Sequence, residues 1–172
     1  MKDSHSARET LNDMGRGANT KTTRSASMKQ SRPTYETENT KNAEREFCAT
    51  LASVWGVRMV EMAPQYQIDR LLFRGGADAV AALEVKCLNK TSAKCEQYGD
   101  IFLNLEKYTA LMVYAGLGIP SIFAVRLIDG DYFCKLRPGD QFTVRHTGRT
   151  DRGDLLDIKP VVRLLWGGFK LI

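Results

Sequence analysis

The stretch AVAALEVK, residues 79–86, decides the fold of this chain. Its first seven residues are almost wholly apolar and small, which predicts a strand covered on both faces. Charges then appear abruptly, at Glu84 and Lys86. Because side chains alternate along a strand, we expect these two on one face of the sheet and Val85 on the other. A carboxylate and an ammonium group are therefore predicted side by side at the edge of a sheet.

A hairpin is predicted just before this strand. Residues 57–62 and 67–73 have strand-like composition, residues 63–64 break them apart, and residues 74–78 turn the chain. The second of these strands carries Asp69 among apolar neighbours, within reach of Glu84 and Lys86. Asp78 lies in the turn and would replace Asp69 only if the strand register were shifted. Its turn position favours a structural role.

A helix is predicted over residues 39–55. Asn39 or Thr40 can cap it, apolar residues recur at helical spacing, and Gly56 ends it. Glu44 falls on the apolar stripe and should point toward the core, whereas Glu46 falls on the solvated face. A core-facing carboxylate needs a salt bridge or a metal ion, and for Glu44 alone the salt bridge is the simpler reading.

The expected cluster of carboxylates has a definite chemistry. Hard oxygen ligands suit magnesium, and a lysine beside them can orient or help to deprotonate a water that attacks a phosphodiester. The acid-x-lysine triplet alone is weak evidence, because the chain contains a second one, Asp157-Ile158-Lys159. Pro160 follows that triplet and no long apolar strand precedes it, so Asp157 and Lys159 are interpreted as surface charges.

Downstream residues complete an α/β pattern. Asn104 can cap a helix over residues 105–115, and Asp129-Gly130 predicts a hairpin between strands at 121–127 and 131–136. We therefore expect an α/β fold with a central mixed β-sheet flanked by helices. Beyond Pro138 there are strand-like runs at 142–145 and 161–166, to which the sequence assigns no function.

These stretches together resemble the PD-(D/E)xK nuclease superfamily, and within it the archaeal Holliday junction resolvases and related phage nucleases. The opening Asn-Ala-Glu-Arg-Glu at 42–46, Asp69 on the hairpin, Glu84-Val85-Lys86, and residues 118–125 agree in order and spacing. The likeness covers roughly residues 41–136. The proline that the family name implies before the aspartate is replaced by Ile68, and this proline binds no metal.

The resemblance implies a restriction-endonuclease-like core and a magnesium-dependent DNA endonuclease, with manganese as a possible substitute. In such a site Asp69, Glu84 and the Val85 carbonyl hold the metal. Lys86 positions the attacking water, and Glu44 orients a water at the metal or a second ion. Related resolvases act on branched DNA as dimers, so a homodimer that binds DNA is expected.

Three residues are candidates for DNA binding. Lys107, in the first turn of the second helix, could touch the scissile or a neighbouring phosphate, or could be an exposed lysine without a partner. Arg145 and Arg149 belong to a basic cluster near His146 that could follow a DNA backbone, or could be a solvated loop. The net charge of +5 favours a polyanionic partner but does not prove one.

The chain of 172 residues is expected to form a disordered basic tail, residues 1–40, and one nuclease domain, residues 41–172, with a core at 41–136 and a C-terminal β extension at 137–172. The tail could be a weak arm onto phosphates or only a solubilising segment. The four cysteines lack the spacing of a zinc site and should be reduced thiols.

Apolar runs are too short to span a membrane, so we expect a cytoplasmic protein, in a host cytoplasm if phage-encoded. Two other functions stay open. One is an exonuclease or nicking enzyme of recombination or repair, and the other is a nuclease fold that only binds DNA or a protein partner.

Overall fold

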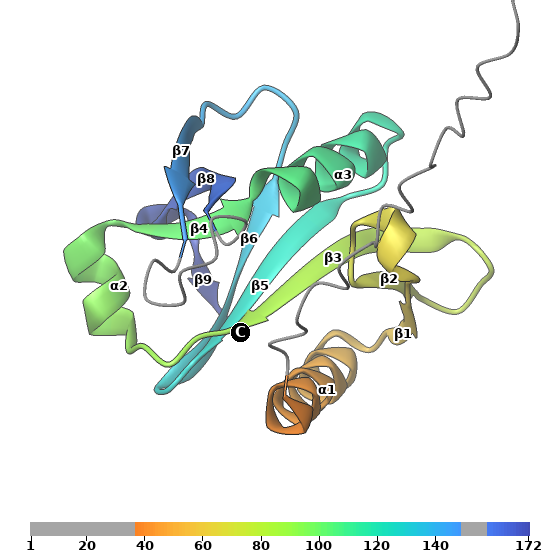
Figure 1. Ribbon diagram of the computed structural model, residues 1–172. Coiled ribbons are helices and arrows are strands. Elements are labelled where there is room, and N and C mark those ends of the chain that lie inside the picture. Colours follow the sequence, from red (N-terminus) through yellow and green to blue (C-terminus); the bar gives the residue numbers. More distant parts are fainter. Residues whose placement is uncertain (1–36, 149–157) are drawn as a thin grey trace, which may run out of the picture. The chain divides into compact units, whose positions relative to one another are not determined.

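The computed structural model describes residues 37–148 and 158–172, which fall within one compact unit at residues 35–172 (Figure 1). The predicted disordered tail therefore lies almost wholly outside the described residues, as does the short segment that contains Arg149 and Asp157. The architecture below concerns the described residues alone.

The main sheet has six strands in the order β1-β2-β3-β5-β6-β9. β3 and β5 are parallel, and the other neighbours are antiparallel, so the predicted mixed sheet is confirmed. The strands are β1 (Arg58–Glu61), β2 (Arg70–Phe73), β3 (Ala79–Cys87), β5 (Ser121–Leu127), β6 (Gly130–Leu136) and β9 (Lys170–Leu171).

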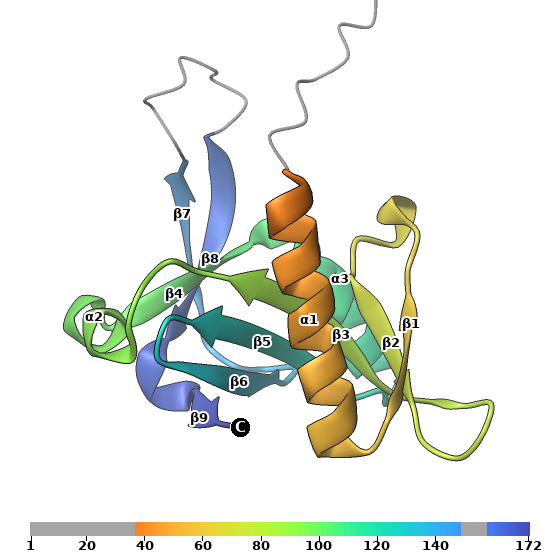
Figure 2. The same ribbon diagram turned by 90° about the horizontal axis from the view of Figure 1, so that it is seen from below.

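One face of this sheet is covered by α1 (Glu38–Trp55) (Figure 2). Phe47 and Leu51 are fully buried there, against Leu83 and Val85 of β3. The cap is Thr37, whose side chain accepts a hydrogen bond from the Thr40 backbone N–H, so the expected cap at 39 or 40 was wrong by two or three residues. Several residues suited to helix capping follow one another here, so the residue types alone do not predict which of them is the cap.

The opposite face is covered by α3 (Leu105–Gly116), which Asn104 caps as predicted. Tyr108 and Leu111 pack on this side with Ala82, Phe123 and other apolar residues of the sheet. Strand β3 is thus buried on both faces, as its small apolar residues predict, and α1 and α3 lie on opposite sides of it (Figure 1).

A second sheet was not predicted. It contains β4 (Asp100–Asn104), β8 (Lys159–Leu165) and β7 (Thr143–Thr147), in the order β4-β8-β7. A short helix, α2 (Ser92–Tyr98), links β3 to β4. Two 3-10 turns, η1 (Pro64–Tyr66) and η3 (Trp166–Gly168), complete the described elements. Strands from the C-terminal stretch therefore pair with β4 and β6 of the preceding part of the chain.

Strand β2 begins later than predicted. Gln67 has the left-handed value φ 56° and ends η1, so the extended conformation cannot start there. Asp69 lies one residue before β2 and is nevertheless fixed to β3, because its N–H donates to the Leu83 carbonyl at 3.2 Å. The start of β2, the end of β3 and the first turn of α3 are thereby brought to one place.

Candidate active site

Asp69, Glu84 and Lys107 form the centre of the candidate site. The Lys107 Nζ donates to Asp69 Oδ1 at 2.8 Å and to Glu84 Oε2 at 3.0 Å. The two carboxylates therefore converge on a single cation, although Asp69 lies just before β2 and Glu84 lies on β3. The prediction that Asp69 reaches Glu84 across the hairpin is consistent with this geometry. Lys107 comes from α3, so three elements contribute one charge each.

Asp69 is held in place by β3, the strand that also carries Glu84 and Lys86. Its Oδ2 accepts a hydrogen bond from the Val85 backbone N–H at 2.9 Å, which leaves Oδ1 to face Lys107. The preceding Ile68 is 2% exposed and packs in the core on the α3 side. The buried Ile68 side chain thus fixes the backbone just before Asp69, at the position where the name PD-(D/E)xK implies a proline.

Glu84 is one of two buried polar residues that the structure describes, at 8% exposure. Burial, together with the nearby Asp69 carboxylate, raises the pKa of Glu84 to about 8, and Lys107 opposes this rise. The pKa of Glu84 is raised even though Lys107 stands beside it, so one neighbouring cation does not fully offset the burial and the Asp69 charge. The site is therefore built to hold positive charge between Glu84 and Asp69.

Lys86 lies on the same face of β3 as Glu84, as the alternation predicts. Glu84 contacts Lys107 of α3, and the Lys86 Nζ donates to the Phe102 carbonyl of β4 at 3.0 Å. Burial lowers the pKa of Lys86, and the negative charge of Glu84 only partly compensates. Lys86 thus releases a proton more easily than an exposed lysine does, which suits a group that handles the proton of an attacking water.

The pKa of Lys107 is shifted in the opposite direction from that of Lys86. Burial alone would lower its pKa, but the charges of Glu84 and Asp69 and the hydrogen bonds to them raise it. The alternative reading of Lys107 as a lysine without a partner is wrong. Its role in binding DNA stays a prediction. The two lysines of the site therefore differ, since the pKa of Lys107 is raised and that of Lys86 is lowered.

Glu44 reaches the same region from α1. It lines a cleft of about 410 Å³ together with Asp69 and Lys107, and it is half-buried. The core-facing orientation predicted for it is consistent with this position, and Glu46 is exposed as expected. Glu44 lies on α1, whereas Lys107 lies on α3, so the cleft joins residues of helices that cover opposite faces of the sheet.

The remaining predicted residues lie elsewhere. Arg145, on β7, lines a different hollow that Lys86 also borders. Arg149 and Asp157 lie outside the described residues. Lys159 begins β8, and Asp78 is exposed in the turn before β3, at the far end of that strand from Glu84.

The sequence analysis missed the Phe102 carbonyl that holds Lys86. A backbone oxygen leaves no trace in residue type. The strand that supplies it alternates in burial but not in polarity, because Phe102 is apolar and partly exposed between the buried Ile101 and Leu103. All four cysteines are free thiols, as expected.

Among the described residues there is no group of three or more His, Cys, Asp or Glu side chains arranged to hold a metal ion. The chain offers two converging carboxylates instead. This donor set fits magnesium, which is usually bound through one or two carboxylates, with water and substrate phosphates completing its shell. It does not fit a structural zinc site, which needs four protein ligands.

A mixed sheet with an aspartate, a glutamate and a lysine gathered where two of its strands meet defines the class of the PD-(D/E)xK nucleases. A family profile described as "Phage putative PDDEXK endonuclease" matches residues 30–172, and the chain belongs to this family. It is therefore a nuclease by family, and the predicted membership of the superfamily is confirmed.

Two further comparisons add context. A solved structure titled as Hjc, a Holliday junction resolvase from the archaeal hyperthermophile Archaeoglobus fulgidus, is similar over 74% of this chain and 84% of that one, with 16% identity and a TM-score of 0.46. No curated protein matched the sequence. Among the described residues, no helix has both the length and the apolar character needed to cross a membrane.

Proposed function

We propose that this protein is a magnesium-dependent DNA endonuclease that acts preferentially on branched DNA. The observation that carries the proposal is the convergence of Asp69 and Glu84 on one cation, at 2.8 and 3.0 Å, two residues along β3 from the half-buried Lys86. Two carboxylates that converge on one cation serve cation binding better than they serve folding, because their mutual repulsion must be offset. Action in the cytoplasm, on DNA during recombination, repair or phage DNA processing, belongs to the same proposal.

Asp69, Glu84 and the Val85 carbonyl would hold the magnesium ion, and manganese could replace it. Bound there, the ion would neutralise the charge that develops on the phosphate during in-line attack by water. The Val85 N–H keeps Asp69 in place, and burial keeps Glu84 in one position. Glu44, from the cleft side, would orient a water or a second ion.

Lys86 would position the attacking water and take part in moving its proton. The Phe102 carbonyl fixes one side of its ammonium group, so the remaining N–H bonds are directed. Its lowered pKa suits this task. Lys107 would leave the two carboxylates when the ion enters and would then contact a DNA phosphate.

We predict that magnesium binding depends strongly on pH. Because the pKa of Glu84 is raised to about 8, the ion must displace a proton below that pH and none above it. Apparent affinity should therefore rise about tenfold per pH unit up to about pH 8 and then level off. Calorimetry in buffers of different ionisation enthalpy should show close to one proton released at pH 7 and almost none at pH 9. An affinity independent of pH would contradict the assignment of Glu84.

We predict that, at a pH high enough to ionise Glu84, Lys107→Met binds magnesium more tightly than the wild type, because the competing ammonium group is gone. Without metal at that pH, the variant should melt at a lower temperature, since Asp69 and Glu84 then lack a counter-charge; added magnesium should restore most of the loss. The matched control is Lys41→Met, which lines the same cleft but pairs with Glu38 at 3.6 Å. Equal magnesium affinity in the two variants would show that Lys107 does not occupy the ion's position.

The proposed function is tested by incubating the protein with four-way junctions, flaps, linear duplex and supercoiled plasmid, in magnesium and in calcium. Symmetric paired cuts near the junction crossover are expected. Progressive shortening of linear DNA would instead identify an exonuclease, and single cuts in the plasmid a nicking enzyme. If no substrate is cut in magnesium while DNA is bound, the fold serves only as a binding module.

We also propose that the active form is a homodimer, because symmetric cuts in two strands require two sites. Sedimentation of the protein with and without a four-way junction measures this directly. Two protomers per junction are expected, and a single protomer that makes both cuts would contradict the proposal.

A further inference from the structure

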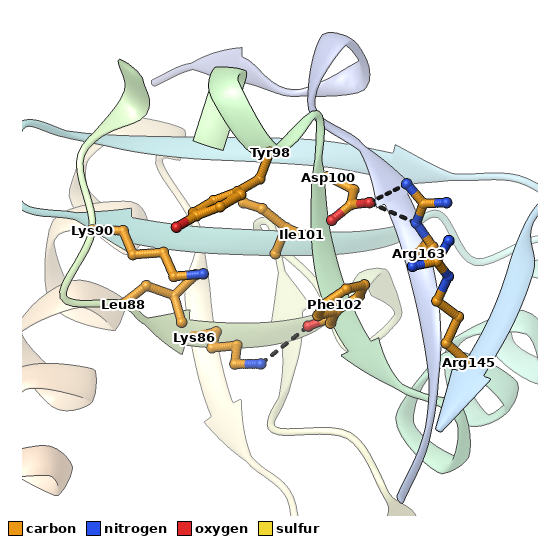
Figure 3. Close-up of a pocket in the computed structure, with 9 residues that line it drawn as sticks. All are labelled: Lys86, Leu88, Lys90, Tyr98, Asp100, Ile101, Phe102, Arg145 and Arg163. Carbon is orange, nitrogen blue, oxygen red and sulfur yellow. Dashed lines mark hydrogen bonds and ion pairs between the residues drawn. The ribbon is translucent and has the colours of Figure 1, made fainter. Parts of the chain in front are cut away.

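A second hollow, of about 410 Å³, lies beyond the end of β3 (Figure 3). Its walls come from the segment after β3, from the end of α2, from β4, and from β7 and β8 of the second sheet. No local pattern in the sequence predicts this hollow, because it forms between segments far apart in the chain. Two of its residues have predicted nuclease roles, Lys86 in catalysis and Arg145 in DNA binding.

Four cations line this hollow: Lys86, Lys90, Arg145 and Arg163. Of the described residues around it, Asp100 is the one acid, and it is already bound by the Arg163 guanidinium. The hollow therefore has a positive excess, and Arg145 and Lys90 are exposed at its rim. An anionic group such as a phosphate is the ligand that this charge balance favours.

The hollow also has a surface suited to a planar ring. Tyr98 is 55% exposed, and the Lys90 Nζ lies 5.3 Å from the centre of its ring. Leu88, Ile101 and Phe102 add apolar walls. In Figure 3, Tyr98, Lys90 and Lys86 lie on one side and the two arginines on the other, with Asp100 and Phe102 of β4 between the two groups. Aromatic surface flanked by cations is the pattern that holds single-stranded nucleic acid.

Lys86 connects this hollow to the candidate active site. It lies two residues after Glu84 on the same face of β3, and its ammonium group reaches Phe102 inside the hollow. Lys86 follows Glu84 on β3 and precedes Leu88 and Lys90 of the hollow, so one continuous segment links the carboxylate pair to the hollow.

Resting on the proposed nuclease function, we propose that this hollow binds one unpaired nucleotide of the DNA strand, adjacent to the phosphate that is cut. Its base stacks on Tyr98, and its phosphate contacts Lys90 and Arg145. A base inside a duplex is stacked and paired and does not enter such a hollow without being unstacked. The substrate class is then DNA with an unpaired nucleotide beside the cleavage point, as at a branch, flap or bulge.

The test measures binding, not cleavage. A short single-stranded oligodeoxynucleotide with one 2-aminopurine is titrated with protein in EDTA, and fluorescence quenching reports stacking of that base. Tyr98→Ala should lose the quenching and bind about 5- to 100-fold more weakly, as expected for one base stacked on an aromatic ring. Tyr98→Phe should retain both, because the ring remains.

Tyr66→Ala is the matched control, since Tyr66 is 51% exposed and lies outside the hollow. It should bind the oligonucleotide as the wild type does. The proposed phosphate contact is tested by comparing Lys90→Ala with Lys135→Ala. Lys135 is an exposed lysine on β6, outside the hollow. Affinity of Tyr98→Ala for a blunt duplex should change less than about twofold. Equal losses for duplex and single strand, or no loss at all, would overturn the proposal.

The outcome separates the two proposals. A protein that cuts DNA in magnesium but shows no dependence on Tyr98 keeps its nuclease function and loses the nucleotide site. A protein that cuts nothing, yet quenches the probe in a Tyr98-dependent manner, loses the nuclease function and keeps the site as a nucleotide-binding hollow.

Discussion

Lys86→Ala is expected to lose DNA cleavage while retaining DNA affinity. Loss of a side chain that takes part in proton transfer lowers a rate by about 10²- to 10⁴-fold. Lys86 has this position because its ammonium group is held by the Phe102 carbonyl and its pKa is lowered by burial, two residues from Glu84. Binding rests on many phosphate contacts, so one half-buried lysine contributes little to it. Single-turnover cleavage and filter binding in calcium measure the two effects.

The chain contains its own control for this variant. Lys159 ends the second acid-x-lysine triplet and begins β8, away from the carboxylate pair. Lys159→Ala should cleave at the wild-type rate. Equal activity of Lys86→Ala and Lys159→Ala would show that the first triplet is not the active site, and a large loss only in Lys159→Ala would move the site to the second sheet.

Asp69→Asn is expected to abolish cleavage and to weaken magnesium binding. Asparagine keeps the shape and can still accept the Val85 N–H, but it removes one of the two charges that converge on the cation. Electrostatic stabilisation by a bound ion contributes several kcal/mol, so a loss of roughly 10³-fold or more in rate is expected. Isothermal calorimetry should show weaker magnesium binding in the same variant.

Asp78→Asn is the matched control. Asp78 is exposed in the turn before β3, and its charge faces no residue of the site. Its variant should cleave and bind magnesium as the wild type does. A loss in Asp78→Asn with normal activity in Asp69→Asn would mean that the metal acid was assigned to the wrong strand. Melting temperatures of both variants should confirm that each is folded.

The local elements of the fold were predictable because each carries its own signal. Residues 79–85 are apolar on both faces, and this marks a strand that two layers cover. The spacing of Phe47 and Leu51 marks the helix that packs on it, and Asp129-Gly130 marks the hairpin of β5 and β6. Periodicity and turn chemistry act over a few residues, so sequence order alone is enough to detect them.

The strand boundaries were less predictable. The strand at 67–73 begins only at Arg70, because Gln67 adopts a left-handed conformation at the end of η1. Nothing in the residue type of Gln67 requires this conformation, and the packing of the turn imposes it. The second sheet was missed for a related reason: β4 pairs with β8, about 60 residues later, and such pairing leaves no local signal.

The sequence by itself determined an α/β fold, the helix that presents Glu44, and a buried strand that ends in Glu84 and Lys86. Tertiary structure alone decided that Lys107 stands between Asp69 and Glu84, that a backbone carbonyl holds Lys86, and that cations from distant segments line one hollow with Tyr98. The physical reason is range. Alternation and helical spacing are local properties of the chain, whereas a charge acquires its partner and its pKa only when distant segments bury it together.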